Sequence, residues 1–344
     1  MKVVLFANHH LATSISLTAA LLAAAASHSR LEVVAIVEAA RLPPGRARLP
    51  RELAVRLGRR LGDPFSPAPF SQVPAFTTLA ALARRYRVPL LVPPTRAVNH
   101  PALVERLATE IRPDASLSLM VDQIFRPALL AACGEPINYH NAALPAYRGI
   151  GAPEWGIYRG DRSSSYTFHR MTEDLDAGSI LVDGSIPVPV TANGDEVERA
   201  KTARAAAAIP VLFEQMLERE PGRAQEGEVS TFTLAELEAV RDVGDGSGHT
   251  YGELERRLRA FGSIKLTHRD ELVEATAIRP AGGASALTSA DGRRFAPSRI
   301  AHLRPSIFRL YSSTGLIWSE GPPPPDHGTL TPTPETDPPS ADPH

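Results

Sequence analysis

The sequence contains a single cysteine, Cys133, among its 344 residues. Because a disulfide needs two cysteines, a disulfide scaffold within one chain is excluded, and so is a zinc site built from several cysteines. We expect Cys133 to be a small hydrophobic residue that is buried or half-buried.

Long apolar stretches are absent as well. No segment reaches the roughly 18 apolar residues that a membrane-spanning helix needs. The apolar run Leu17–Ala26 resembles a signal-peptide core, but it follows a strand-like Val3–Phe6 and the polar residues Asn8, His9 and His10. The sequence therefore predicts a helix at this position, no membrane contact and a cytoplasmic location.

Neither charge is in excess, since 37 Lys and Arg residues oppose 38 Asp and Glu residues, for a net charge of −1. A uniformly basic, nucleic-acid-binding surface is therefore disfavoured, although a local basic patch is compatible with this balance. One such patch lies in the Pro-rich segment 41–74, where the seven arginines of Arg41–Arg60 accompany a single acid, Glu52. This run predicts either a solvated helix face or contact with an anionic ligand or RNA.

Glycine is missing where a dinucleotide-binding enzyme needs it. The chain opens with a strand-like, a helical and a second strand-like segment, which is how a nucleotide-binding fold begins. The first glycine, however, is Gly45, far beyond the position of a G-x-G-x-x-G phosphate loop. This absence argues against an NAD or FAD enzyme of the usual Rossmann type.

The rest of the composition is globular, with 43% hydrophobic and 22% charged residues, and a chain of this length predicts about two domains. Strand-like and helical segments alternate, which predicts an α/β fold with a Rossmann-like, doubly wound parallel sheet. The expected strands are Lys2–Ala7, Leu31–Glu38, Pro89–Val92, Ala115–Val121 and Pro136–Asn138. The expected helices are Ser14–Ser27, Phe76–Arg87, Pro101–Glu110, Phe125–Ala132 and one long helix at 195–219.

The pattern changes after Gly227 to short strands and turns around one helix, Tyr251–Phe261. We therefore expect a catalytic domain at 1–220 and a smaller C-terminal module at 228–312. The segment 321–344 has nine prolines in 24 residues and almost no large apolar side chains. It cannot bury enough surface to offset the entropy of ordering, so we predict a disordered tail.

Chemistry-bearing residues gather between Ile137 and Leu181. Asn138 and His140 are two positions apart at the predicted end of a strand, so they project from the same side. In open α/β sheets the ligand crevice lies beyond the carboxyl ends of the strands. An amide donor and an imidazole placed there suit stabilisation of a developing oxyanion. A carboxylate such as Asp176 could tune the imidazole and relay a proton.

Each of these features also has a plain structural explanation. An Asn-x-His pair is common in ordinary turns, and His169 on an apolar strand would more often be structural than a ligand. Asp176, followed by Ala-Gly, is compatible with a simple turn residue. The combination is more specific than any of its parts.

The combination resembles the 10-formyltetrahydrofolate-dependent formyltransferases. Their signature is Asn-x-His, Leu-Pro-x-Tyr-Arg-Gly, Thr-x-His and Leu-Asp-x-Gly, and this sequence contains INYHNAALPAYRG and then SYTFHRMTEDLDAGSIL. The separation of 38 positions between Asn138 and Asp176 also matches. The family includes enzymes that act on methionyl-tRNA, glycinamide ribonucleotide and amino sugars. The resemblance is strongest over residues 110–190.

The resemblance implies a Rossmann-like catalytic domain without the glycine fingerprint, a C-terminal OB-like module, 10-formyltetrahydrofolate as co-substrate and no metal. It implies Asn138, His140 and Asp176 as a catalytic triad, with Thr167 and His169 as supporting residues. The pterin ring of the folate would be held largely by backbone groups. The residues implied for that cofactor site are Leu119, Met120, Val121, Gln123, Ile124, Asp174 and Leu175, and those implied for an acceptor loop are Tyr147, Arg148 and Trp155.

The sequence departs from the family pattern in the loop after His140. Ala142 stands where family members usually have serine, Asn141 precedes it, and Pro153 lies one position late. The Pro-Asp-x-Pro-x-Gly-Arg signature of the tRNA enzymes is also not found, and Glu38–Arg48 stands in its place. The segment Tyr166–Met171 is closer to the amino-sugar enzymes.

We therefore expect formyl transfer to the amine of a small molecule, such as an amino sugar or a secondary-metabolite amine. Methionyl-tRNA formyltransferase is the main alternative, favoured by the basic run Arg41–Arg60 and the C-terminal module. A formyltetrahydrofolate hydrolase, which would use water as acceptor, and a non-catalytic binding protein of the same fold also stay open. A homodimer is compatible with each of these functions.

Overall fold

The computed structural model describes residues 1–39, 78–244, 249, 251–268, 271–280, 287–288 and 294–302. Two sequence predictions therefore lie outside the described residues, namely the role of Arg41–Arg60 and the disorder of the tail at 321–344. The C-terminal module expected at 228–312 is described only in part.

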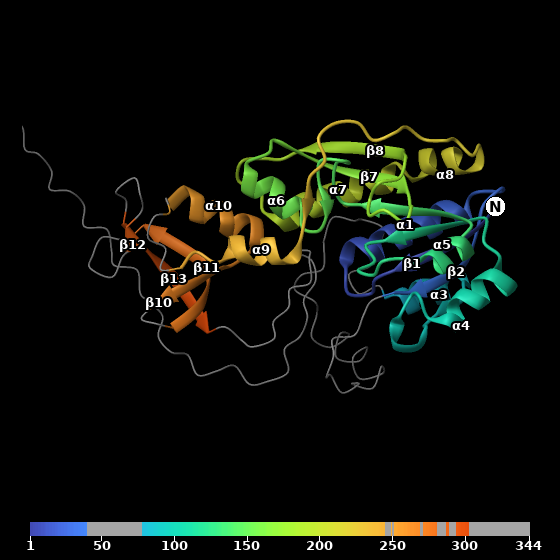
Figure 1. Cartoon of the computed structure of the whole chain (residues 1–344), viewed down its shortest axis with the longest axis horizontal. Coiled ribbons are helices and arrows are strands. Elements are labelled where there is room, and N and C mark those ends of the chain that lie inside the picture. The colour runs from blue at the N-terminus through green and yellow to red at the C-terminus, as the bar shows by residue number, and fades with distance from the viewer. Residues whose placement is uncertain are drawn as a thin grey trace, which may run out of the picture.

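A seven-stranded sheet forms the centre of the N-terminal part (Figure 1). Its order is β3-β2-β1-β4-β5-β7-β8, in which the first five strands run parallel and the last two are antiparallel to their neighbours. The strands are β1 Lys2–Ala7, β2 Glu32–Glu38, β3 Leu90–Leu91, β4 Ala115–Leu119, β5 Glu135–His140, β7 Ser163–Arg170 and β8 Ile180–Pro187. The predicted α/β fold with a mostly parallel sheet is confirmed.

Helices cover both faces of this sheet. One face carries α1 Ala12–Ala26, α3 Leu79–Tyr86, α7 Gly194–Ala207 and α8 Ile209–Leu217. The other carries α4 Pro101–Arg106, its continuation Leu107–Ile111, and α5 Pro127–Ala132. None of the helices in the described part of the chain combines the length and the apolar character needed to cross a bilayer.

Strand β1 shows why an uninterrupted apolar run suits this position. Val3 and Leu5 pack into the apolar cluster that includes residues of α1 and α8, whereas Val4 and Phe6 pack into the cluster that includes α4 and α5. Successive side chains of a strand point to opposite faces, so a strand covered on both sides needs apolar residues at every position. The sheet order places β1 beside β4, where the direction of strand addition reverses and ligand crevices usually lie.

The single helix predicted over 195–219 is wrong. The structure has two helices there, α7 and α8, and the break falls at Ala208. Pro210 explains the break, because proline has no N–H to donate and its ring clashes with the carbonyl four residues earlier, so it is tolerated only in the first turn of a new helix.

The region after Gly227 contains a second helix besides the predicted Tyr251–Phe261. This helix, α9 Leu234–Arg241, begins with a capping box in which Thr233 and Glu236 bond each other's backbone N–H groups. The T-x-x-E spacing was therefore a helix signal. The expectation of one helix in this region is wrong, while the bounds of α10, Tyr251–Phe261, match the prediction.

The C-terminal part continues into a four-stranded antiparallel sheet of order β10-β11-β13-β12. Its strands are β10 Ile264–His268, β11 Glu271–Pro280, β12 Leu287–Thr288 and β13 Arg294–His302. Helix α10 packs beside α6 Ala152–Arg159 (Figure 1), and Trp155 shares an apolar cluster with Phe232, Leu237 and Phe261. The domain limits and the OB-like character of this module stay predictions.

Candidate active site

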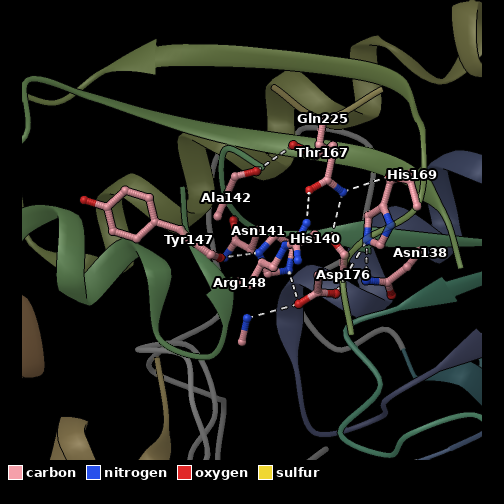
Figure 2. Close-up of polar contacts among 12 residues, drawn as sticks. Asn138, His140, Asn141, Ala142, Tyr147, Arg148, Thr167, His169, Asp176 and Gln225 are labelled. Atoms are coloured by element: carbon pink, nitrogen blue, oxygen red, sulfur yellow. Dashed lines mark hydrogen bonds and ion pairs between the residues drawn. The ribbon is translucent and has the colours of Figure 1, made fainter. Parts of the chain in front are cut away.

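The polar residues singled out in the sequence meet at the end of β5 and on the last residues of the adjacent strand β7. The antiparallel register of these strands pairs Asn138 with His169 and His140 with Thr167. The pairing of two adjacent strands therefore brings together side chains that lie about thirty positions apart in the sequence (Figure 2). This explains why Asn-x-His and Thr-x-His occur with matching spacing.

Asp176 reaches the same place from the loop between β7 and β8. Its backbone has φ 50°, in the left-handed region that residues other than glycine rarely adopt. Two positions later, a Cβ on Gly178 would collide with the carbonyl oxygen of Arg170. Only glycine permits this close approach, so the Asp-x-Gly spacing has a direct structural cause.

The carboxylate of Asp176 lies between two imidazole rings. Its Oδ2 atom is 3.6 Å from His140 Nδ1, and its Oδ1 atom is 3.6 Å from His169 Nε2. The backbone N–H of Gly149 also donates to Oδ2, at 3.0 Å. The structure therefore brings the three residues of the expected triad and His169 into one cluster (Figure 2).

The surroundings keep this carboxyl group ionised. Burial alone would raise the pKa of Asp176, but the facing His140 and His169 and the Gly149 N–H outweigh it and lower the pKa to about 2. For His140 the balance is opposite, because burial lowers the pKa of the ring more than Asp176 and the Tyr147 carbonyl raise it. A base that gives up its proton readily thus sits beside a fixed negative charge.

The hydrogen-bond partners determine where His140 can change its protonation state. Its Nε2 atom lies 2.6 Å from the backbone carbonyl oxygen of Tyr147, which can only accept, so Nε2 carries a hydrogen. The proton that comes and goes is therefore the one on Nδ1, which faces Asp176. With Nδ1 protonated, the ring and the carboxylate form an ion pair.

Asn138 and His169 form the other side of the cluster. His169 Nδ1 donates to the carbonyl oxygen of Arg170 at 2.8 Å, and its Nε2 atom faces both Asp176 and Asn138. The Nδ2 atom of Asn138 lies 3.3 Å from that nitrogen. Since a carboxamide nitrogen has two hydrogens, this contact leaves Asn138 a second N–H to donate to a ligand. Thr167 instead supports the loop after β5, donating to the Ala142 carbonyl at 2.7 Å.

The segments expected to hold the folate differ in what they expose. Ile124 and Leu175 are large apolar side chains that are 71% and 55% exposed. Both segments touch the same apolar cluster, through Val121 on one and Met171 on the other. Each of these two loops therefore exposes one large apolar side chain. The remaining expected contacts lie on the same loops, with Met120 partly buried and Asp174 exposed.

Two residues expected at the cofactor site have side chains that contact other parts of the protein instead. Leu119 is fully buried in the core. The carboxamide of Gln123 donates to the carbonyls of Ala39 and Arg96 and accepts from the N–H of Val98 at 3.1 Å. These side chains hold the loop after β4 in place, so only the backbone groups of these residues are available for the folate contacts that the resemblance implies.

The three residues of the expected acceptor loop also lie in different surroundings. Trp155 is only 6% exposed and stacks on Phe232 at 4.8 Å inside the apolar cluster of α6 and α10. The hydroxyl of Tyr147 donates to Asp161, so it is the backbone carbonyl of Tyr147 that reaches His140. Arg148 is tied to Gln225 at 2.8 Å.

A buried polar network lies directly behind this loop. Lys201 on α7 is fully buried and donates to the carbonyl of Asn141, the residue after His140, at 2.7 Å. The side chain of Asn141 donates to Glu198, which also accepts from Thr13 at 2.6 Å. Burial lowers the pKa of Lys201 to about 8, although Glu198 and Glu154 oppose this shift.

Sequence reasoning missed several of these partners. The Tyr147 carbonyl and the Gly149 N–H are backbone groups, which leave no trace in residue identity. Gln225 lies in an irregular segment without a motif. Lys201 did carry one signal, since it is among only three lysines in an arginine-rich chain.

The described residues contain no group of three or more His, Cys, Asp or Glu side chains placed to hold a metal ion. The polar groups that the structure brings together here are the amide of Asn138, the two imidazoles, the Asp176 carboxylate and the surrounding backbone groups.

Comparison with known proteins gives a consistent result. Residues 85–212 match a family model described as formyl transferase. The chain is 33% identical over 96 residues to GDP-perosamine N-formyltransferase of Brucella melitensis, which covers 28% of this chain and 37% of that protein. It is 28% identical over 213 residues to methionyl-tRNA formyltransferase of Gloeothece citriformis, covering 60% of this chain and 54% of that protein. The matched part is thus less than two thirds of either relative.

The fold also resembles solved structures. WlaRD, a sugar 3N-formyl transferase whose crystal structure was determined in the presence of dTDP and 5-N-formyl-THF, superimposes with a TM-score of 0.54 and 13% sequence identity. The superposition covers 89% of this chain and 99% of that one. At this level of identity the likeness concerns the fold.

Proposed function

We propose that the chain is a formyltransferase, as its match to the formyl transferase family model supports, and that it moves the formyl group of 10-formyltetrahydrofolate to the amine of a small-molecule acceptor, an amino sugar or a secondary-metabolite amine. The observation that carries this proposal is the cluster of Asn138, His140 and Asp176, in which an ionised carboxylate faces the imidazole at 3.6 Å.

In the proposed reaction the neutral amine of the acceptor attacks the formyl carbon. A new C–N bond forms, the bond between the formyl carbon and N10 of the folate breaks, and the amine proton ends on N10. The formyl oxygen becomes an oxyanion on the way, and the second N–H of Asn138 is its donor. The Nδ1 atom of His140 takes up the proton, stabilised by Asp176, and returns it to the leaving nitrogen.

The proposal assigns the folate to the loops that carry Ile124 and Leu175. These two side chains are exposed, and burial of apolar area by a flat pterin ring would stabilise the complex at roughly 25 cal/mol per Å². WlaRD, of similar fold, was crystallised in the presence of 5-N-formyl-THF. Backbone groups of the loops after β4 and β7 would supply the polar contacts.

Three observations favour a small acceptor over tRNA. The net charge of −1 does not favour a broadly positive surface. The signature of the tRNA enzymes after the second strand is absent. One relative by name acts on GDP-perosamine, and WlaRD was crystallised with dTDP. Methionyl-tRNA stays the second candidate, because another relative is named for it.

The test offers the purified full-length chain 10-formyltetrahydrofolate together with GDP-, dTDP- or UDP-linked amino sugars, or methionyl initiator tRNA, and measures release of tetrahydrofolate and formylation of the acceptor. We expect turnover with a nucleotide-linked amino sugar and none with the His140→Ala variant. A weak salt dependence is also expected, because a diphosphate makes few ionic contacts, whereas a tRNA complex with six or more phosphate contacts would lose about 10³-fold in affinity between 50 and 200 mM salt.

Formylation of methionyl-tRNA with that steep salt dependence would show that the acceptor class is wrong. Release of tetrahydrofolate at the same rate with and without any acceptor would identify a hydrolase instead.

A further inference from the structure

Gln225 lies outside every motif, yet its side chain reaches the candidate site. It belongs to the irregular segment between α8 and β9 Thr231–Phe232. Its Nε2 atom donates to two backbone carbonyls, those of Asp176 at 2.7 Å and Gly178 at 2.8 Å. Its Oε1 atom accepts from the guanidinium of Arg148 at 2.8 Å (Figure 2). Both hydrogens of the carboxamide and its oxygen are therefore engaged.

The segment that carries Gln225 is fastened on both sides of the site. Arg223 and Ile180 exchange backbone hydrogen bonds at 2.8 and 2.9 Å, at the start of β8. On the other side, β9 pairs with β6 Arg148–Gly149, and Arg148 N–H donates to the carbonyl of Ser230 at 2.9 Å. The backbone around Gln225 is thus fixed relative to both loops that its side chain joins.

The contacts form a closed ring around the catalytic carboxylate. Gln225 holds the backbone of Asp176 and the side chain of Arg148, while Gly149, the next residue, donates its N–H to the carboxylate of Asp176. Asp176 therefore has its main chain and its side chain fixed from the same two segments. A residue at φ 50° keeps that conformation only where its surroundings determine it.

We propose that Gln225 is a positioning residue, which holds the Asp176 loop in the conformation that aims the carboxylate at His140 and couples this loop to Arg148. The assignment rests on the proposed function, because it gives Gln225 a role in the same reaction. Gln225 acts through Asp176 and does not touch the reacting atoms.

Two substitutions separate the two halves of this role. In Gln225→Glu the length and the acceptor for Arg148 are kept, but an oxygen replaces the nitrogen that faces the carbonyls of Asp176 and Gly178, so the contact becomes repulsive. In Gln225→Met the shape is similar and all three hydrogen bonds are lost. The matched control is Gln215→Met on α8, the same exchange in a helix away from the site.

We expect both Gln225 variants to lose kcat by about 10²-fold, the size of effect that misplacing a catalytic group by about 1 Å produces. The KM for the folate should rise as well, because Asp174 and Leu175 lie in the same loop as Asp176, whose backbone Gln225 holds. Gln215→Met should retain wild-type kcat. Thermal unfolding of all three variants checks that each is folded at the assay temperature.

A second readout needs no turnover. The groups that act on the pKa of His140 are Asp176, His169, Lys201 and the Tyr147 carbonyl, and among them Asp176 is the largest that raises it. If the carboxylate moves away, the pKa of His140 should fall further, because the nearby opposite charge that favours the protonated ring is lost while burial still disfavours it. NMR titration of ring-labelled histidine measures it, with His140→Asn to assign the signal.

A wild-type kcat and an unchanged His140 titration in both Gln225 variants would overturn the proposal. Loss of stability with an unchanged titration would overturn it too, because it would reduce Gln225 to a structural residue. If the wild-type protein transfers no formyl group, the proposed function fails, while a lowered His140 pKa in the Gln225 variants still supports the positioning role.

Discussion

Replacing Lys201 by methionine should destabilise the protein strongly. Methionine keeps an unbranched apolar stem but removes the charge and the hydrogen bond to the Asn141 carbonyl, which is 2.7 Å long. The buried carboxylates of Glu198 and Glu154 would lose the electrostatic attraction of the ammonium group. Removing one member of a buried pair costs about 3–5 kcal/mol, and the unmet carbonyl is included in that range.

This magnitude corresponds to a fall of roughly 6–20 °C in Tm, at about 2–4 °C per kcal/mol. Urea unfolding followed by circular dichroism gives the free energy directly. The double variant Lys201→Met/Glu198→Gln should recover much of the loss, because the unpaired charge is gone. A double-mutant cycle over the pair therefore reports the coupling.

The loss should also grow with pH. Burial raises the pKa of Glu154 to about 7, and Lys201 is one of the groups that lower it. A carboxyl whose folded pKa is raised contributes stability below its unfolded pKa near 4.5 and loses it as pH rises through the folded value. Without Lys201 the folded pKa of Glu154 rises further, so that decline continues to higher pH and the variant should suffer more at pH 8 than at pH 6.

An exposed ion pair provides the control. Arg30 has a side chain that is 54% exposed and lies 3.1 Å from Glu214 and 3.4 Å from Glu218. Exposed pairs contribute about 0–1 kcal/mol, so Arg30→Ala should change the stability little. An effect of Lys201→Met no larger than that of Arg30→Ala would refute the reasoning about the buried network.

Three further predictions follow from the structure and the sequence. Because the pKa of Asp176 is lowered to about 2, its ionised form stabilises the fold above the unfolded pKa near 3.8. This contribution, about 2 kcal/mol, is lost as pH falls towards 2. Asp176→Asn should remove that acid dependence of stability, which unfolding curves at several pH values measure. Gly178→Ala should lower both Tm and tetrahydrofolate release, since its Cβ would collide with the Arg170 carbonyl, and wild-type values for both would contradict the loop geometry. Ending the chain at Glu320 should leave Tm unchanged, because the Pro-rich tail has little to bury, whereas a drop of several degrees would show that the tail docks.

The sequence was sufficient for most of the sheet and for the gathering of the polar cluster. Strands such as β1 and β2 are encoded locally, by short apolar runs, and the Asn138 and Asp176 motifs carry their own spacing. The prediction of one long helix over 195–219 is wrong because Pro210 breaks the helix in spite of the alanine-rich composition around it. Helix α9 was missed although Thr233 and Glu236 form a capping box.

What the sequence could not supply are contacts between segments that are far apart. The partner of His140 is the Tyr147 carbonyl, a group that every residue possesses. Gln225 and Asp176 lie 49 positions apart, and nothing local marks the former. The burial of Trp155 depends on packing against α10, which lies far away in the sequence. The residues around Trp155 therefore do not reveal that it is buried and not in an acceptor loop.

The central claim is that Asn138, His140 and Asp176 together perform formyl transfer, and the most direct test is the rate of tetrahydrofolate formation from 10-formyltetrahydrofolate with the accepted amine, measured for the wild type and the three alanine variants. Loss of one oxyanion donor should reduce the rate by about 10²–10³-fold, and loss of the acid-base pair by about 10²–10⁴-fold, in variants that stay folded. Near-normal turnover in any one of Asn138→Ala, His140→Ala or Asp176→Ala would contradict the account.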